Sequence, residues 1–191
     1  MQTRPTLQSD AELIATIRER SGREREMACS EIYSRYSQKV YVYCRRILDD
    51  SRSAEDILQE TFVRLVKSAQ SDVVIENVHS FIFRIARNLC LNMKRERRVE
   101  LIEFEEFSHS NSGSQFDNQD LKEVLSLSLN ILPDDHREAV VLQLYNGYSY
   151  DEIGTMMNVP VTTVRNWVVR AKSKLRATLA PYFDNDDLKP L

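Results

Sequence analysis

The segment between residues 147 and 176 constrains the fold of this chain more than any other. Ser149, followed three residues later by Glu152, forms a capping-box pattern that predicts a helix beginning at Tyr150. Pro160 ends this helix because proline lacks an amide hydrogen and restricts the residue before it. A second helix is expected directly after the proline. Two short helices around a tight turn are typical of a helix-turn-helix, which places side chains in the major groove of DNA.

The second of these helices has two opposite faces. At helical spacing, Val164, Val168, Ala171 and Leu175 share one apolar stripe. Between Val161 and that leucine the sequence has basic residues and no acidic ones, so no side chain there repels phosphate. A helix seated in a groove needs this opposition of apolar and basic faces. The predicted groove-facing residues are Arg165, Asn166, Val169, Arg170, Lys172 and Arg176.

Two kinds of contact are expected from the outward face. Arg165 and Asn166 are the candidates for reading base edges, because arginine can bridge guanine acceptors and asparagine can pair with adenine. Trp167, at the border of the apolar stripe, is interpreted as a packing residue. For the outward face as a whole, the alternative to DNA binding is a basic helix face that is simply exposed to solvent and binds nothing. The expected phosphate contacts are Arg170, Lys172, Lys174 and Arg176.

Charge is segregated along the chain although its total is small. The 191 residues carry a formal net charge of −3, which is not typical of a general nucleic-acid binder. Residues 81–98 contain six basic side chains and one acidic one, whereas residues 100–106 contain four acidic side chains and no basic ones. Local fields therefore guide association. Such a chain is expected to bind naked DNA weakly unless another body holds it there.

Cofactor and enzyme chemistry find little support in the sequence. Three cysteines stand at wide spacing, and with the three histidines they form no metal-ligand pattern. Gly-rich phosphate loops and nucleophile motifs are also lacking. We therefore expect no metal, no cofactor and no enzymatic activity, and we expect reduced thiols. Neither a signal peptide nor a long apolar run is present, which favours a cytoplasmic protein without membrane insertion.

Helical spacing elsewhere predicts an all-α fold of two small domains. Four helices are expected in the first half, and no strands. Asp10 and Ser53 are the expected N-caps of the first and third helices. The third is expected to carry Ala54, Ile57, Leu58, Thr61 and Leu65 on its inward face. The fourth is expected to run from Ser80 to Arg98, with Phe81, Ile82, Ile85, Leu89 and Met93 facing the core. The Ser-rich composition of residues 99–120 predicts a flexible linker. The expected parts are a first domain at 1–98, this linker, a second domain at 121–183 opened by two helices around Pro133, and an acidic tail at 184–191.

Three blocks of the sequence follow one another in a recognisable order. The first block is residues 54–62 (AEDILQETF), and the second is residues 83–89 (FRIARNL) with Lys94 and Arg95. The third block comprises Leu132-Pro133, Arg137-Glu138, residues 150–154 (YDEIG), residues 163–166 (TVRN) and Arg170-Ala171. Together the three blocks resemble the extracytoplasmic-function (ECF) group of bacterial sigma factors, and the resemblance covers nearly the whole chain.

The resemblance implies a role for each block. The first would bind core RNA polymerase on the clamp helices of its largest subunit, with Asp56, Gln59, Glu60 and Val63 as one helix face. The second would melt and read the minus-10 element, with Asn88 holding a flipped base and residues 71–79 completing the pocket. The third would read the minus-35 element, near the polymerase flap. The implied minus-10 residues are Arg84, Arg87, Asn88, Lys94 and Arg95.

The chain also departs from the family pattern at four positions. Members of the group usually have Trp at position 81, Gly at 162, Ser at 166 and often Arg at 167, where this chain has Phe, Thr, Asn and Trp. The last two lie in the reading helix, so the minus-35 sequence does not follow by analogy. Membership further implies promoter DNA and an inhibitory anti-sigma protein as partners.

Two other functions are weighed against an initiation subunit. A stand-alone helix-turn-helix regulator would need a dimer interface or a sensor pocket, and it would bind its DNA without polymerase. An enzyme with an appended DNA-binding domain lacks any supporting motif. A gel shift with and without core polymerase discriminates the first alternative from a sigma factor.

Overall fold

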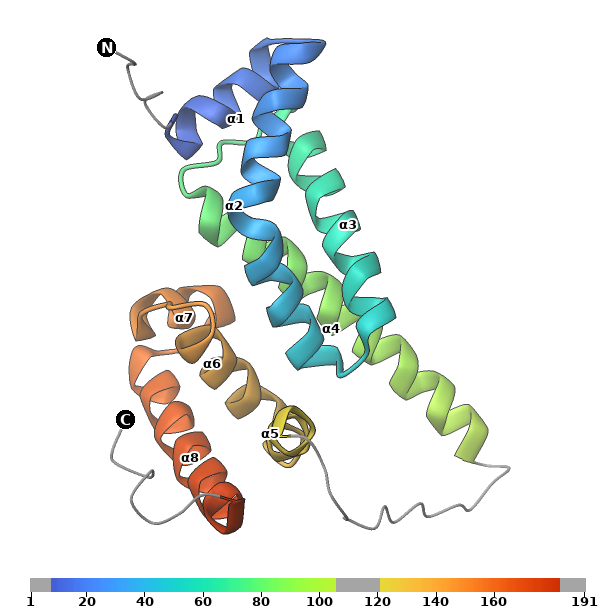
Figure 1. Ribbon diagram of the computed structural model, residues 1–191, viewed down its shortest axis with the longest axis vertical. Helices are drawn as coiled ribbons and strands as arrows, with labels where there is room; N and C mark the ends of the chain where they lie inside the picture. The colour runs from blue at the N-terminus through green and yellow to red at the C-terminus, as the bar shows by residue number, and fades with distance from the viewer. Residues whose placement is uncertain (1–7, 106–120, 183–191) are drawn as a thin grey trace. The chain divides into compact units, whose positions relative to one another are not determined.

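The computed structural model describes residues 8–105 and 121–182. Within these ranges the chain forms eight α-helices and a terminal 3-10 helix, and it contains no strand (Figure 1). The predicted all-α fold class is confirmed. Contacts divide the chain into two compact units, one comprising Met1–Arg45 and Asp50–Asn92 and the other Arg46–Asp49 and Met93–Leu191. None of the described helices combines the length and the apolar character that crossing a bilayer requires.

Helix α1 (Asp10–Glu19) begins one residue earlier than its expected cap implies. Ser9 is the N-cap and forms a capping box with Glu12, so the prediction that Asp10 caps this helix is wrong. The Asp10 carboxylate instead accepts hydrogen bonds from the Tyr36 hydroxyl and, at 2.8 Å, from Arg35 Nη1. Both donors belong to α2 (Arg23–Leu48). Asp10 therefore ties α1 to α2.

Helix α3 (Ser51–Ala69) is capped by Asp50, so the prediction of Ser53 as its N-cap is also wrong. The Asp50 carboxylate accepts from the amides of Arg52 and Ser53, each at 3.3 Å, and from the Ser53 hydroxyl. A carboxylate that meets two free amides at the helix start outcompetes a hydroxyl inside the first turn. The inward face is as predicted, and its buried residues include Ala54, Ile57, Leu58, Thr61 and Leu65.

Helix α4 (Val78–Glu105) is longer than predicted at both ends. Asn77 precedes it, and the Asn77 side-chain oxygen accepts from the Ser80 amide at 2.9 Å. The C-terminal extension makes the first seven residues of the expected linker helical. Residues 106–120, the rest of that linker, and the tail from residue 184 lie outside the described residues.

The buried face of α4 is rotated from the predicted one. Phe83 is fully buried and packs edge-on against Tyr43 of α2, with ring centroids 5.7 Å apart. Ala86 and Cys90 follow it by three and seven residues, on the same face. These two small side chains and Phe83 form the buried face of the helix. Ile82 is buried as predicted. Four residues predicted to face the core are only half-buried, because they lie beside this face: Phe81, Ile85, Leu89 and Met93.

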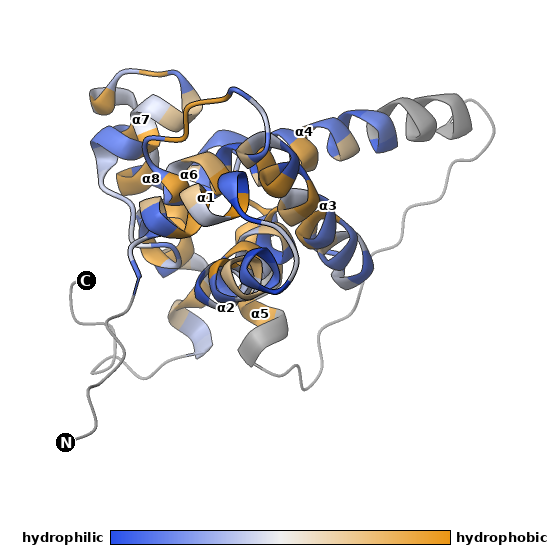
Figure 2. Cartoon of the chain, turned by 90° about the horizontal axis from the view of Figure 1, so that it is seen from above, coloured by the Kyte–Doolittle hydropathy of each residue, from blue (hydrophilic) through white to orange (hydrophobic). Residues whose placement is uncertain are grey.

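The second unit is built around α8 (Val161–Leu179). This helix packs against α5 (Leu121–Asn130), α6 (Asp134–Leu144) and α7 (Tyr150–Met157), and the 3-10 helix η1 (Ala180–Tyr182) follows it. Figure 2 colours the chain by hydropathy, and hydrophobic residues (orange) occur along α6, α7 and α8. Pro133 is the N-cap of α6, as the sequence predicts a helix opening there.

Arg137 of α6 binds the end of α5. Its Nε donates to the Leu129 carbonyl at 2.9 Å, and its Nη2 donates to the carbonyls of Asn130 at 2.9 Å and Leu132 at 3.2 Å. Carbonyls at the end of a helix have no partner inside the helix. In the sequence Arg137 is marked only as part of the third block, and these contacts give it a structural role.

Replacing this arginine is expected to destabilise the second unit. Arg137→Met keeps the aliphatic stem but removes the three charge-assisted bonds, which should cost about 2 kcal/mol. The chain has one tryptophan, Trp167, so its fluorescence during urea unfolding reports on the second unit. Arg176→Met, at an exposed position of α8, is the matched control. An unfolding midpoint for Arg137→Met equal to that of the control would contradict the capping role.

Candidate nucleic-acid interface

The helix-turn-helix forms with the predicted caps. The Glu152 carboxylate accepts from the Ser149 amide at 2.9 Å, and the Ser149 hydroxyl oxygen accepts from the Glu152 amide at 3.3 Å. Helix α7 ends at Asn158, which adopts a left-handed conformation with φ of 56°. Pro160 then caps α8, which begins at Val161 as expected.

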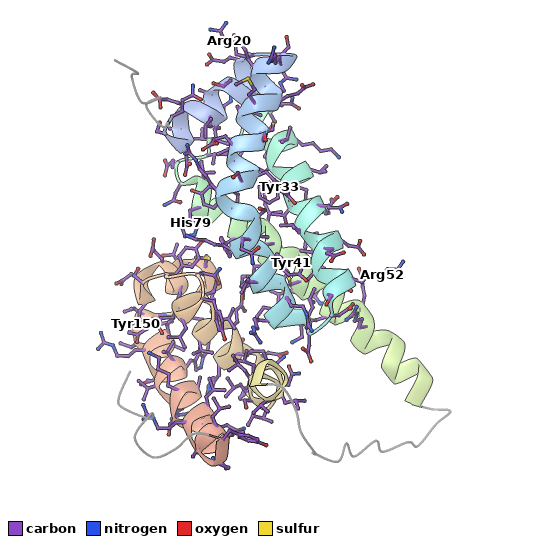
Figure 3. All side chains as sticks on the ribbon, viewed as in Figure 1. Arg20, Tyr33, Tyr41, Arg52, His79 and Tyr150 are labelled. Carbon is purple, nitrogen blue, oxygen red and sulfur yellow. The ribbon has the colours of Figure 1, made fainter. Side chains whose placement is uncertain are left out.

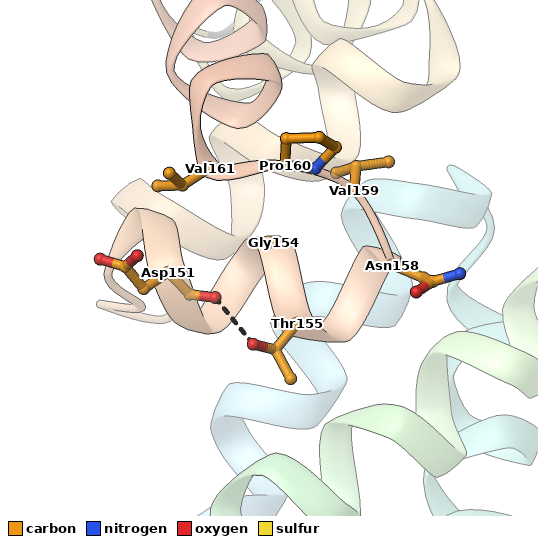
Figure 4. Close-up of a pocket in the computed structure, with 7 residues that line it drawn as sticks. All are labelled: Asp151, Gly154, Thr155, Asn158, Val159, Pro160 and Val161. Atoms are coloured by element: carbon orange, nitrogen blue, oxygen red, sulfur yellow. Dashed lines mark hydrogen bonds between the residues drawn. The ribbon is translucent and has the colours of Figure 1, made fainter.

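Gly154 allows the two helices of this motif to approach each other. A Cβ at this position would lie 2.9 Å from the Val159 carbonyl oxygen, a backbone atom that cannot move aside freely. The turn around it borders a hollow of about 460 Å³ (Figure 4). In the same view, the Thr155 hydroxyl donates to the Asp151 carbonyl at 3.0 Å. From the sequence, Gly154 stands out only as part of the third block, because a close backbone approach leaves no periodic signal.

Helix α8 has the two faces that the sequence predicts. Its buried residues are Val164, Val168, Ala171 and Leu175. Val169 lies on the outward face and is 59% exposed, although it is apolar. Half-buried Trp167 lies beside His136, with ring centroids 6.1 Å apart. Of the predicted DNA-binding residues on this helix, Arg165, Asn166, Val169, Arg170 and Arg176 are exposed and Lys172 is half-buried.

The charge on this face comes from its lysines and arginines and not from His136. Burial and the nearby positive charges of Arg170 and Lys174 lower the pKa of His136, so the imidazole is neutral at pH 7. Lys174 itself donates to the Ile131 carbonyl at 2.7 Å. The structure thus gives this lysine a partner within the protein, where the sequence predicted a phosphate contact.

The predicted polar face of α3 lies on the surface of the first unit. Asp56, Gln59 and Val63 are exposed. Glu60 is half-buried and pairs with Arg64 at 2.6 Å, one turn along the helix. Val63 is 45% exposed and gives this face an apolar contact.

A groove of about 310 Å³ between α2 and α3 was not anticipated from the sequence. Tyr33 and Phe62 line it, with ring centroids 4.8 Å apart, and Figure 3 labels Tyr33 on α2. Cys29 also lines it, and burial raises the pKa of this thiol. Cys29, Cys44 and Cys90 are all free thiols. The described residues contain no group of side chains arranged to hold a metal ion.

The basic side chains of α4 lie outside its buried face. Arg84 and Asn88 are exposed, and Arg84 stacks its guanidinium over the Phe81 ring, 5.1 Å from the centroid. Phe81 thus supports a cation at the surface, which is a role that spacing alone does not reveal. Of the remaining predicted minus-10 residues, Arg95 is exposed and Arg87 and Lys94 are half-buried.

Comparison with known proteins identifies both units. The family model for Sigma-70 region 2 matches residues 32–99, and that for Sigma-70 region 4 matches residues 122–175. The ECF RNA polymerase sigma factor SigM of Bacillus subtilis is 31% identical over 159 residues, covering 79% of this chain and 94% of the relative. SigW of the same organism is 29% identical over 166 residues, covering 80% and 89%.

Solved structures show the same fold. The sigma factor RpoE in complex with the anti-sigma factor NepR, from Bartonella quintana, matches with a TM-score of 0.65 at 23% identity, covering 78% of this chain and 94% of that one. CnrH in complex with the cytosolic domain of CnrY matches with a TM-score of 0.67 at 21% identity, covering 90% and 97%. The chain therefore belongs to the ECF sigma factors of the sigma-70 family, the non-enzymatic subunits that bind core RNA polymerase and direct promoter recognition and transcription initiation.

Proposed function

We propose that this sigma factor divides promoter recognition between two weak DNA-binding domains, residues 1–98 and 121–183, which core polymerase aligns. The observation that carries the proposal is the geometry of α8, whose apolar stripe is buried while its cationic stripe faces outward. On polymerase, each domain raises the effective concentration of the other at the promoter, with the chain between α4 and α5 as the tether. The net charge of −3 accords with weak binding by the free protein.

For the minus-35 element, Arg165 and Asn166 are the proposed base readers, and Arg170, Lys172 and Arg176 are the proposed phosphate contacts. Val169 adds an exposed apolar side chain that suits a thymine methyl group. Arginine and asparagine both offer two-point hydrogen bonding to a base edge. Phosphate contacts set the register of the helix without reading sequence.

Arg165→Ala is expected to relax discrimination at one or two base pairs of the minus-35 element. A bidentate contact contributes about 1–3 kcal/mol of discrimination against the wrong base. The measurement is holoenzyme affinity for a set of duplexes with single substitutions in this element. Arg176→Ala is the matched control, because losing a phosphate contact weakens binding uniformly. A uniform loss with Arg165→Ala as well would assign this residue to phosphate.

For the minus-10 element, α4 and the preceding loop are the proposed reader. Asn88 is exposed and has both a donor and an acceptor for the edge of an unstacked base. Arg84, Arg87, Lys94 and Arg95 would neutralise the phosphates of the opened strand. No bond chemistry takes place: the opened strand is stabilised by the contacts that it gains.

Core polymerase is proposed to bind the face of α3 that carries Asp56, Gln59, Glu60 and Val63, with its clamp helices as the receptor, and its flap is proposed to receive the second domain. We also propose that the protein acts in the cytoplasm. By extension from the RpoE complex, an anti-sigma protein is a further proposed partner. Adding that partner to a transcription reaction should suppress the transcripts.

Reconstituted transcription tests the proposal as a whole. Purified protein and core polymerase are incubated with a library of genomic fragments, and the transcript start sites are mapped. The expected result is a set of defined starts that share two sequence elements. Gel shifts with and without core polymerase accompany this experiment. Tight, specific binding by the free protein would contradict the cooperation of two weak domains, as would the absence of any defined start.

A further inference from the structure

Arg18, in the last turn of α1, binds the end of α3 and the loop that follows it. Its Nε donates to the Ala69 carbonyl at 3.0 Å, and its Nη2 donates to the Val73 carbonyl at 2.9 Å. The first bond reaches the last residue of α3, and the second reaches the middle of the loop formed by residues 70–77. One side chain therefore fixes two points of backbone that are four residues apart.

The two ends of this loop have anchors of their own. At its start, the Ser71 amide and hydroxyl both donate to the Ser68 carbonyl, at 3.2 Å and 2.8 Å. At its end, the Asn77 side chain accepts from the Ser80 amide. Within the described residues, no backbone–backbone hydrogen bond involves residues 72–76. Among the hydrogen bonds of the described residues, the one from Arg18 to the Val73 carbonyl reaches the backbone of this middle stretch.

Most of the residues after Val73 are exposed to solvent. Val74 is 75% exposed, and Glu76 and Asn77 are also exposed, whereas Ile75 is half-buried. On the other side, His79 stacks on Tyr36 with ring centroids 5.6 Å apart, so the start of α4 is held against α2. The chain thus has a largely exposed stretch, residues 74–76, between two fixed points.

We propose that Arg18 is a positioning residue for minus-10 recognition: it holds the loop so that residues 74–76 present a fixed surface to the opened DNA strand. The inference rests on the proposed function, in which this loop completes the pocket for a flipped base. It assigns a role to α1, which lies outside residues 32–99 matched by the region 2 family model. A base extruded from the stack is gripped only by groups already in place, so a loose loop would lose discrimination before it lost general affinity.

The test compares Arg18→Met with Arg20→Met. Methionine keeps most of the stem of Arg18 and removes its donors. Arg20 is an exposed arginine at the end of the same helix, and its side chain pairs only loosely with Glu24, at 3.7 Å (Figure 3). The two variants therefore lose the same charge from the same region. Arg18→Lys restores a charged donor and serves as the rescue variant.

The first readout is DNA discrimination by holoenzyme. Single-stranded oligonucleotides carry the minus-10 sequence mapped by transcription, either intact or with one base replaced. Arg18→Met is expected to reduce the affinity ratio between intact and substituted strands by about tenfold, which corresponds to about 1.4 kcal/mol. Arg20→Met should keep the ratio of the unaltered protein, and Arg18→Lys should recover part of it. Equal ratios for Arg18→Met and Arg20→Met would overturn the inference.

The second readout needs no DNA. NMR order parameters of the full chain should fall for the backbone of residues 72–76 in Arg18→Met, with those of α2 and α4 unchanged. Unchanged order parameters in residues 72–76 would overturn the inference. Lower order parameters throughout α1–α4 would overturn it as well, because the role of Arg18 would then be the stability of the whole bundle.

Loop variants separate failure of this inference from failure of the proposed function. Val74→Ala and Glu76→Gln alter the presented surface without touching Arg18. If these variants change the discrimination ratio and Arg18→Met does not, the positioning role is wrong and the minus-10 assignment stands. If neither loop variant changes the ratio, the loop does not read the minus-10 strand, and the inference fails together with that part of the proposed function.

Discussion

Holoenzyme assembled with Asp56→Lys and Glu60→Lys is expected to produce no transcripts. Asp56 is exposed and Glu60 is half-buried, on one face of α3 beside exposed Val63. Reversing two carboxylates at a complementary interface should lower the affinity for core polymerase about a hundredfold or more, which corresponds to about 2.7 kcal/mol. Because promoter recognition depends on alignment by polymerase, the loss of binding becomes a loss of initiation.

The fold should tolerate these two substitutions. The Glu60–Arg64 pair is exposed, with 44% and 50% of the two side chains accessible, and pairs of this kind contribute little to stability. Thermal unfolding should therefore stay close to that of the unaltered protein. The matched control reverses Glu24 and Glu26, which are exposed at the start of α2 and produce the same change in net charge. Polymerase binding that is equal in the control and the double variant would refute the docking face.

The helices with strong periodicity could be predicted from sequence because the burial of one apolar stripe decides which face of the helix points inward. The capping box before α7 and the apolar stripe of α8 agree, so the start of each helix, the buried residues of α8 and the turn between the helices were predicted correctly. The inward face of α3 was correct for the same reason. Its cap was wrong, because two competing cap residues, Asp50 and Ser53, stand three positions apart and only their geometry decides between them.

The remainder depends on contacts between distant parts of the chain. The buried face of α4 follows the packing of Phe83 on Tyr43, whereas the sequence alone offers an apolar stripe through Phe81 and Ile85 of similar quality. Arg18 binds carbonyls 51 and 55 residues away, and no local pattern marks such a partner. The local sequence allows several buried faces for α4 and several partners for Arg18. Contacts between distant parts of the chain select one of each, so they can be known only once the fold is known.

Gly154→Val is expected to disrupt the second unit and to abolish recognition of the minus-35 element. Any Cβ here would lie 2.9 Å from the Val159 carbonyl oxygen, and valine adds two further methyl groups. Replacing glycine by valine in a helix interior gains only about 0.4 kcal/mol of helix propensity, because valine is itself a moderate helix former. Overpacking against fixed backbone costs about 1–3 kcal/mol or more, and the branched side chain lies at the upper end. With the strain from its extra methyl groups, we expect a net loss of about 3 kcal/mol.

Urea unfolding followed by Trp167 fluorescence measures this loss, because the only tryptophan lies in the second unit. Thr155→Val is the matched control: it places the same side chain one residue along α7, at an exposed position. If helix propensity decided the outcome, the control would be the more destabilised of the two, since it replaces threonine and gains nothing from the loss of a glycine. If the close approach of α7 and the turn decides it, Gly154→Val unfolds at much lower urea while the control stays near the unaltered protein. A midpoint for Gly154→Val at or above that of the control would contradict the prediction. It would show that the turn accommodates a larger side chain without loss of stability, so that glycine at position 154 is not required to position α8.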